Sequence, residues 1–301
     1  MKYQFAIMAS MPLLLGVAAF QSPTDTLTHA SATPAFEDTP RNVSFAHVEA
    51  VFRKHHCINC HTVSPRASAG LHLVTPARIM KGGKDGAVVV PGKPDESLLF
   101  KRVTATDRTK MPPGSTRLTQ EEVETIRQWI ADGAEPGKFG DDLENYYVAL
   151  LKGDWKKAAE VSDAIGKMSF DDVSMDERSA ALSLTPFAQL GNEAGWYKAA
   201  EIVVREKKTD DGTLNRIAWT IADPNGMWKR KDADLAIKAA LQAVEGTRRS
   251  SGAILDTLAW SYHLKGDDAM AVKTEKEAMT CSDAKGDVLK AMEDALKTFG
   301  G

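Results

Sequence analysis

The segment Cys57-Ile58-Asn59-Cys60-His61 constrains this chain more than any other part of it. Two thiols separated by two residues, with a histidine directly after the second, have the spacing of a c-type haem attachment site. Each thiol can add to one vinyl group of the same porphyrin, and the adjacent imidazole then lies where it can bind the iron. The sequence therefore predicts one covalently bound haem c per chain, held by Cys57 and Cys60, with His61 as the proximal iron ligand.

Two other chemistries use a similar spacing. A C-x-x-C pair can be a thioredoxin-like redox site, but that site normally lies in a βαβ unit, and no such pattern surrounds Cys57. Two cysteines and a histidine can also supply three of the four ligands of a zinc ion. The remaining cysteine, Cys281, lies far along the chain, so no fourth ligand stands at a plausible spacing. We expect Cys281 to be a partly buried free thiol.

The chain begins with a pattern typical of an export signal. Lys2 precedes an apolar run from Phe5 to Phe20, which is short for a membrane span of about 20 residues. We therefore expect a signal peptide over residues 1–22 and an exported, periplasmic protein, with an uncleaved N-terminal membrane anchor as the alternative. Export agrees with haem attachment, because c-type haem is attached outside the cytoplasmic membrane. No later segment is long and apolar enough to span a bilayer.

The composition is that of a globular protein with an ample core. The 301 residues favour two domains once the signal is removed, and 43% of them are hydrophobic. A net charge of -3, without a basic tract, gives no indication of nucleic acid binding. Residues 23–43 are rich in Ser, Thr, Pro and Asp and read as a linker. Pro and Gly near residue 136 then separate a first domain, 44–136, from a second domain, 141–301.

Two helices are predicted to frame the first domain. Apolar residues recur at helical spacing over residues 44–55, directly before the cysteines, and again over 119–132. Thr119 and Glu122 have the spacing of a capping box at the start of the later helix. A short helix is also expected from Asp95, after a turn rich in Pro and Gly.

Further motifs follow the attachment segment in order: Gly70-Leu71-His72-Leu73, Gly82-Gly83, Val90-Pro91-Gly92-Lys93-Pro94, Lys110-Met111-Pro112-Pro113-Gly114 and Trp129-Ile130. With these motifs, residues 44–136 resemble a small mono-haem cytochrome c domain of the planctomycete type. The resemblance implies an all-α fold in which the first and last helices cross. It also implies that the haem lies in a pocket between them.

The sixth iron position is assigned to Met111. This residue lies 50 positions after His61, in a loop stiffened by two prolines. A thioether is a neutral, soft ligand that raises the reduction potential relative to a second imidazole. In the family that the segment resembles, this position matches the distal methionine. The other candidates are His55, His56, His72 and Met80. The two histidines before the attachment turn are too close to it to reach the opposite face easily, whereas the other two remain open.

The second domain contains a repeated pattern. Residues 214–222 and 255–263 share L-x-x-[IL]-A-W, and Ala-rich segments follow them at 234–243 and 268–278. The copies are offset by 41 and 35 residues, and they resemble tetratricopeptide repeats of helical hairpins. Such arrays present a concave face that suits a peptide or protein ligand. We expect the paired tryptophans of the two copies, Trp219 and Trp260, to pack in the core.

No motif of a second catalytic centre accompanies the haem segment, so we do not expect an enzyme. The leading interpretation is an exported c-type cytochrome that transfers electrons to or from a redox partner protein, with the helical repeats docking that partner. One alternative is a haem-based sensor or a structural haem protein. Another is an electron-entry subunit whose catalytic part is a separate oxidoreductase chain.

Overall fold

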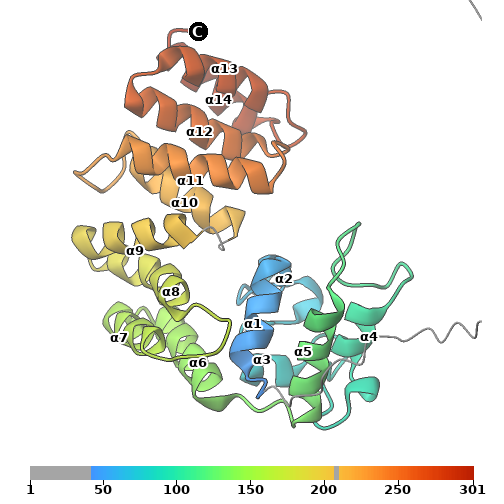
Figure 1. Cartoon of the computed structure of the whole chain (residues 1–301). Coiled ribbons are helices and arrows are strands. Elements are labelled where there is room, and N and C mark those ends of the chain that lie inside the picture. Colours follow the sequence, from blue (N-terminus) through green and yellow to red (C-terminus); the bar gives the residue numbers. More distant parts are fainter. Residues whose placement is uncertain (1–41, 207–209) are drawn as a thin grey trace, which may run out of the picture. The chain divides into compact units, whose positions relative to one another are not determined.

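The computed structural model describes residues 42–206 and 210–301, which form helices without a β-strand (Figure 1). The all-α fold predicted from the sequence is therefore confirmed for these residues. The predicted signal peptide, and the predicted linker up to residue 41, lie outside the described residues. Within the described ranges, no helix combines the length and the apolar character required to cross a bilayer.

Two helices frame the first part of the fold, as the sequence predicts. They are α1 (Phe45–Lys54) and α5 (Gln120–Ala131), which pack against each other (Figure 1). The predicted capping box is present at the start of α5, where the Glu122 carboxylate accepts the Thr119 N–H at 2.7 Å. Between the two helices, the ring centroids of buried Phe45 and Trp129 lie 5.5 Å apart. This contact holds the two ends of the intervening segment together.

That intervening segment consists mainly of turns and short helices: α2 (Cys57–Cys60), η1 (Ser68–Gly70), α3 (Pro76–Lys81), η2 (Pro94–Glu96) and α4 (Leu98–Thr104). The helix expected from Asp95 begins later, at Leu98. Its start is delayed because buried Ser97 closes the preceding turn, where its hydroxyl accepts the Val90 N–H and donates to the Lys93 carbonyl, each at 2.9 Å.

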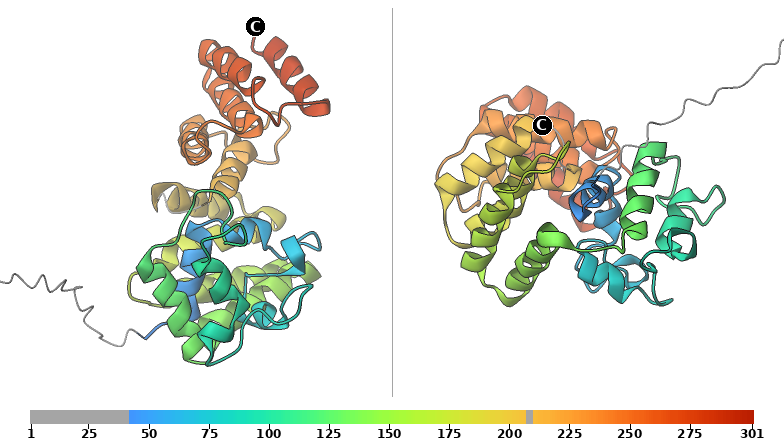
Figure 2. Two further views of the ribbon diagram at one scale, coloured as in Figure 1. Left: turned by 90° about the vertical axis from the view of Figure 1, so that its right-hand side faces the viewer. Right: turned by 60° about the horizontal axis from the view of Figure 1, so that its bottom comes forward.

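The rest of the chain is a succession of helices: α6 (Gly137–Lys152), α7 (Trp155–Gly166), α8 (Met175–Gln189), α9 (Glu193–Glu206), α10 (Asp211–Ala222), α11 (Ala233–Gly246), α12 (Gly252–Lys265), α13 (Asp268–Ala278) and α14 (Asp287–Thr298). From α10 to α13, helices that follow one another in sequence pack side by side. Figure 2 shows this part of the chain, coloured from gold to red, from two further directions. Small residues such as Ala218, Ala239 and Ala240 are fully buried where these helices meet, which lets the backbones approach closely.

The four segments that carry the predicted repeat fall on α10 to α13. The pairs α10–α11 and α12–α13 each pack as a helical hairpin, so their helical character is confirmed. The expectation for Trp219 is wrong, since its side chain is 37% exposed. Ala218 and Ile221 occupy the buried face of α10, and Trp219 packs instead at the surface, with its ring 6.4 Å from that of Trp260.

The segment from α1 to α5 and the following helices share one apolar cluster. Phe139 on α6 is buried, and its ring centroid lies 6.3 Å from that of Phe45 on α1. Buried charges continue this contact, because Glu49 on α1 pairs with Arg178 on α8 at 2.8 Å. Helix α6 begins at Gly137, close to the predicted boundary. That residues 44–136 and 141–301 fold separately stays a prediction.

Candidate haem site

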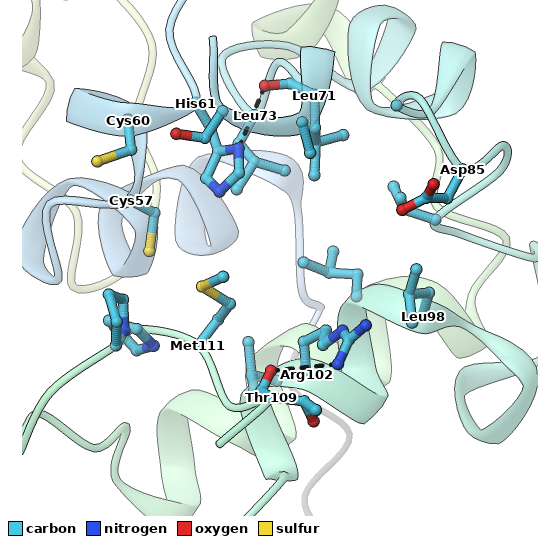
Figure 3. Close-up of a pocket in the computed structure, with 18 of the residues that line it drawn as sticks. Cys57, Cys60, His61, Leu71, Leu73, Asp85, Leu98, Arg102, Thr109 and Met111 are labelled. Carbon is cyan, nitrogen blue, oxygen red and sulfur yellow. Dashed lines mark hydrogen bonds between the residues drawn. The ribbon is translucent and has the colours of Figure 1, made fainter. Parts of the chain in front are cut away.

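A cavity of about 460 Å³ lies beside the end of α1 and is closed on another side by α4 (Figure 3). Aliphatic side chains make much of its wall: Leu71, Leu73, Val88, Leu98, Leu99 and Val103. The volume lies in the range of roughly 300–1,000 Å³ that is usual for small-molecule sites. An apolar wall of this kind suits a large, flat and mainly apolar ligand.

The two thiols of the C-x-x-C-H segment lie together at one end of this cavity (Figure 3). The chain reverses at His56, which has a left-handed φ of 54°, and then forms the single helical turn α2. The His61 N–H donates to the Cys57 carbonyl at 3.0 Å and closes this turn. Cys57 is half-buried and Cys60 is exposed. The backbone turn thus places both sulfur atoms where one ligand edge can meet them.

The His61 ring points into the cavity and is held from behind (Figure 3). Its Nδ1–H donates to the Leu71 carbonyl at 3.3 Å. A backbone bond from the Leu73 N–H to the His61 carbonyl, at 2.9 Å, ties the same two segments together. With Nδ1 as the donor, Nε2 keeps its lone pair on the cavity side, which is the form of imidazole that binds a metal.

Met111 approaches the same space from the other side, so that its side chain faces the His61 ring across the cavity (Figure 3). Its N–H donates to the Arg102 carbonyl at 2.8 Å, which fixes the loop to α4. The Lys110 ammonium donates to the Pro112 carbonyl at 3.3 Å inside the loop. The Met111 side chain is 42% exposed, so this side of the cavity is open to solvent.

The alternative iron ligands lie in other surroundings. The His55 ring bonds to the Glu122 carboxylate at 2.8 Å, and the His72 ring bonds to the Thr62 carbonyl. Met80, on α3, is 40% exposed. None of these three side chains lines the described cavity, whereas His56 does. His56 directly precedes Cys57, so it lies at the attachment turn rather than opposite it.

Burial and local charges set the protonation of two groups near the site. Burial, with a smaller contribution from neighbouring Cys60, raises the pKa of Cys57 to about 11, so the neutral thiol predominates at pH 7. For Glu122, burial alone would raise the pKa. Hydrogen bonds from Lys54, from the Thr119 N–H and from His55 outweigh burial and hold that pKa at about 2. The carboxylate therefore fastens the end of α1 to the start of α5.

Two features of the cavity were not anticipated from the sequence. Gly83 lines it, and a Cβ there would lie 2.8 Å from the Ala69 carbonyl oxygen, so this wall requires glycine. Three cations, Lys84, Arg102 and Arg108, line it as well. They are dispersed in the sequence. The excess of Lys and Arg over Asp and Glu in residues 57–118 is the sequence signal that would have indicated them.

Comparison with known proteins supports the same region. The model of the family described as planctomycete cytochrome C matches residues 57–115, which include both cysteines, His61 and Met111. No curated protein and no solved structure matches the chain. Since the members of a cytochrome c family carry haem, the match implies a haem cofactor for this segment, and the cavity, the paired thiols and the anchored imidazole fit that group. Residues 57–115 of this chain are therefore similar to a planctomycete cytochrome c, which points to an electron carrier.

Proposed function

We propose that this chain is an exported c-type cytochrome that transfers single electrons through one haem c. The observation that carries the proposal is the arrangement in Figure 3, in which His61 and Met111 face one cavity from opposite sides and both thiols lie at one end. Cys57 and Cys60 would hold the haem covalently through thioether bonds. His61 would serve as the proximal iron ligand and Met111 as the distal one.

The surrounding residues hold these groups in position. The Leu71 carbonyl keeps the His61 ring oriented, and the bond from the Met111 N–H to α4 keeps the thioether at the cavity. Most of the cavity wall is apolar, which suits the flat apolar body of a haem. When bound, a haem with histidine and methionine ligands supplies a one-electron couple of relatively high potential. These are the requirements of an electron carrier, and the helices after α5 are proposed to dock its partner as tetratricopeptide-like repeats.

A second candidate function is favoured by the exposure of Met111. A loop that leaves 42% of this side chain in contact with solvent can also release it, which would open a position for a small gas. A haem-based sensor would use that open position, and the helical repeats would transmit the change. The two functions differ in whether Met111 stays bound in the resting protein.

Substitution of Met111 distinguishes them. In the reduced wild type, we expect a six-coordinate spectrum that does not change when carbon monoxide is added. In the oxidised wild type, we expect the weak absorption near the red end of the visible spectrum that reports an iron–sulfur bond. Met111→Ala should abolish that absorption, lower the reduction potential and allow carbon monoxide to bind. The exposed Met80, which does not line the cavity, provides the matched control, and Met80→Ala should behave as the wild type does.

The outcomes separate the candidates. A wild type that binds carbon monoxide at once would favour the sensor. A Met111→Ala spectrum identical to the wild-type spectrum would remove Met111 from the site and return the assignment to His72 or Met80.

A further inference from the structure

Helix α1 contacts both the haem cavity and the helices that follow α5. Phe52, near the end of α1, lines the cavity, whereas Glu49 and Arg53 on the neighbouring face form ion pairs with α8 (Figure 1). At the end of the helix, the His56 N–H donates to the Arg53 carbonyl at 3.0 Å, where the chain reverses toward Cys57. Helix α1 therefore links α8 directly to the turn that carries the attachment thiols.

Four charged side chains make the contact between α1 and α8. Glu49 pairs with Arg178 at 2.8 Å and with Arg53 at 3.2 Å. The Arg53 guanidinium also donates to both carboxylate oxygens of Glu177, at 2.9 and 3.2 Å. Glu49, Glu177 and Arg178 are buried, and Arg53 is half-buried. We call these four residues the α1–α8 network, and its two carboxylates and two guanidinium groups balance in charge.

The network is charged although it is buried. Burial alone would lower the pKa of Arg178. The charge of Glu49, together with Tyr147 and Glu177, outweighs burial and raises that pKa, so the guanidinium stays charged. A buried ion pair usually stabilises a fold no more than apolar side chains of the same size would. The balanced charges of the network therefore indicate a role beyond stability.

The network lies close to the haem cavity. His56 lines this cavity and also a second cleft, of about 540 Å³, whose wall includes Arg53 and Glu177. A helix with its side chains is about 10–12 Å across, so charges on one face of α1 lie within about this distance of a ligand that contacts Phe52 on the next face. With an effective dielectric constant of about 20, one unpaired charge at about 12 Å changes the ratio of reduced to oxidised haem about tenfold at a fixed potential.

We propose that Glu177 and Arg178 are positioning residues that act through α1 to set the reduction potential of the haem. The proposal rests on the electron-transfer function proposed above and assigns a part of it to the helices after α5. Reduction lowers the charge of the haem by one. An unpaired cation beside the cavity therefore favours the reduced form, and an unpaired anion favours the oxidised form. While the four charges of the network balance, neither form is favoured.

The first test compares two substitutions that remove opposite charges, in the full-length haem-loaded protein. Glu177→Gln leaves an excess positive charge in the network and should raise the reduction potential. Arg178→Gln leaves an excess negative charge and should lower it. Each shift should correspond to about a tenfold change in the ratio of reduced to oxidised haem at a fixed potential, measured by spectroscopic redox titration. A purely structural role would weaken the protein in both variants without shifts of opposite sign.

Conservative variants separate charge from packing. Glu177→Asp and Arg178→Lys keep the charges, so the potential should stay at the wild-type value even where urea unfolding shows a lower stability. Glu124→Gln is the matched control for charge, because Glu124 pairs with Arg127 at 2.6 Å in an exposed position, and it should leave the potential unchanged. Leu255→Ala, in the buried part of α12, is the control for lost stability and should also leave the potential unchanged.

The second test leaves the network itself intact. Ala50 lines the cleft beside Arg53 and is half-buried, so the cleft has room for a longer side chain. Ala50→Glu should therefore lower the potential. Ala50→Gln, which has the same shape without the charge, should keep the wild-type value. This pair measures the effect of a charge beside α1 even where a network variant does not fold.

Several results would overturn the proposal. One is a shift of the same sign, or no shift, in Glu177→Gln and Arg178→Gln. Others are an unchanged potential in Ala50→Glu and a shift in Glu124→Gln as large as that in Glu177→Gln. The wild type is first checked for covalent haem and reversible reduction. Their absence would refute the proposed function itself, whereas an intact haem with the same potential in every variant would refute the role of the network alone.

Discussion

The segment from Cys57 to Leu118 and the helices from α6 onward solve the problem of burial in different ways. In the first region, helices of three to seven residues alternate with turns, and many apolar side chains face a cavity. In the second, helices of 11 to 16 residues bury their apolar faces against one another. Short helices gain little from local hydrogen bonding, so their stability depends on packing.

This difference in packing indicates which region should depend on a bound cofactor for its stability. A large apolar cavity leaves side chains without packing partners, and a ligand that fills it stabilises the folded state by mass action. The helical hairpins have no such requirement, because residues such as Ile217 and Leu255 are buried by protein atoms. We therefore expect the first region to depend on its ligand and the second to be independent of it.

The largest effect should follow from removing the attachment thiols. The double variant Cys57→Ala with Cys60→Ala should lose all haem that survives acid–acetone extraction, because no thioether can form. Hydrogen exchange should then show faster amide exchange over residues 57–118 and unchanged protection in α10 to α13. Cys281→Ala is the control and should keep both haem and protection. Equal loss of protection in both regions would contradict the expectation that only the first region depends on its ligand.

The next effect tests whether the two regions are separable. We expect residues 44–136 to fold and bind haem alone, and residues 141–301 to be helical and colourless. Phe139 lies outside the shorter chain, although it packs on Phe45 in the same buried cluster. Extending the first chain to residue 152 should therefore stabilise it by about 3–5 kcal/mol, the usual worth of a buried Phe. Urea unfolding of both chains measures the gain, and equal midpoints would show that α6 is dispensable.

The contact between α1 and α8 should give a somewhat smaller effect. Arg178→Ala removes the 2.8 Å partner of buried Glu49, while Arg53 still pairs with that carboxylate at 3.2 Å. Breaking a buried pair typically costs 3–5 kcal/mol, and we expect about 3 kcal/mol because one partner remains. Lys93→Ala breaks an exposed pair and should cost less than about 1 kcal/mol in the same urea experiment. Similar losses of unfolding free energy in both variants would show that the buried pair stabilises the fold no more than an exposed pair does.

Sequence reasoning succeeded where the signals are local. The periodicity and the capping box predict α1 and α5 to within one or two residues, and the repeated pattern predicts α10 to α13 as helices. It failed where the outcome depends on neighbours distant in sequence. The later start of α4 depends on the turn that Ser97 closes, and the exposure of Trp219 depends on which face of α10 is packed.

In the candidate site, too, the residues with a local sequence signal were predicted and those that depend on distant neighbours were not. The cysteines and His61 are adjacent in sequence, so a motif predicts them, and Met111 follows from the resemblance of its loop to a family. The Leu71 carbonyl that orients His61 carries no sequence signal, because any residue has a carbonyl. The three cations that line the cavity, Lys84, Arg102 and Arg108, lie on separate turns and helices, and their meeting there depends on the fold.

The smallest effect concerns a buried carboxyl in the second region, among the helices from α6 onward. Glu275 on α13 is fully buried, and its carboxyl faces that of Asp256 on α12, to which it can donate a hydrogen bond only when it is protonated. Burial, with repulsion from Asp256 on α12, raises the pKa of Glu275 to about 9. The folded chain therefore keeps a proton that the unfolded chain releases above pH of about 4.5. Stability should consequently fall as the pH rises from about 5 to 9.

Glu275→Gln removes that dependence, since an amide does not titrate. At pH 8 the variant should be more stable than the wild type by up to about a few kcal/mol, because the wild type must take up a proton when it folds at this pH, and the two should converge near pH 4. The neighbouring Glu277 is the matched control, because its pKa is lowered by a surface pair with Arg249. Glu277→Gln should therefore weaken the protein slightly at pH 8. Urea unfolding at both pH values measures the effect, and a Glu275→Gln variant that follows the wild type throughout would refute the raised pKa.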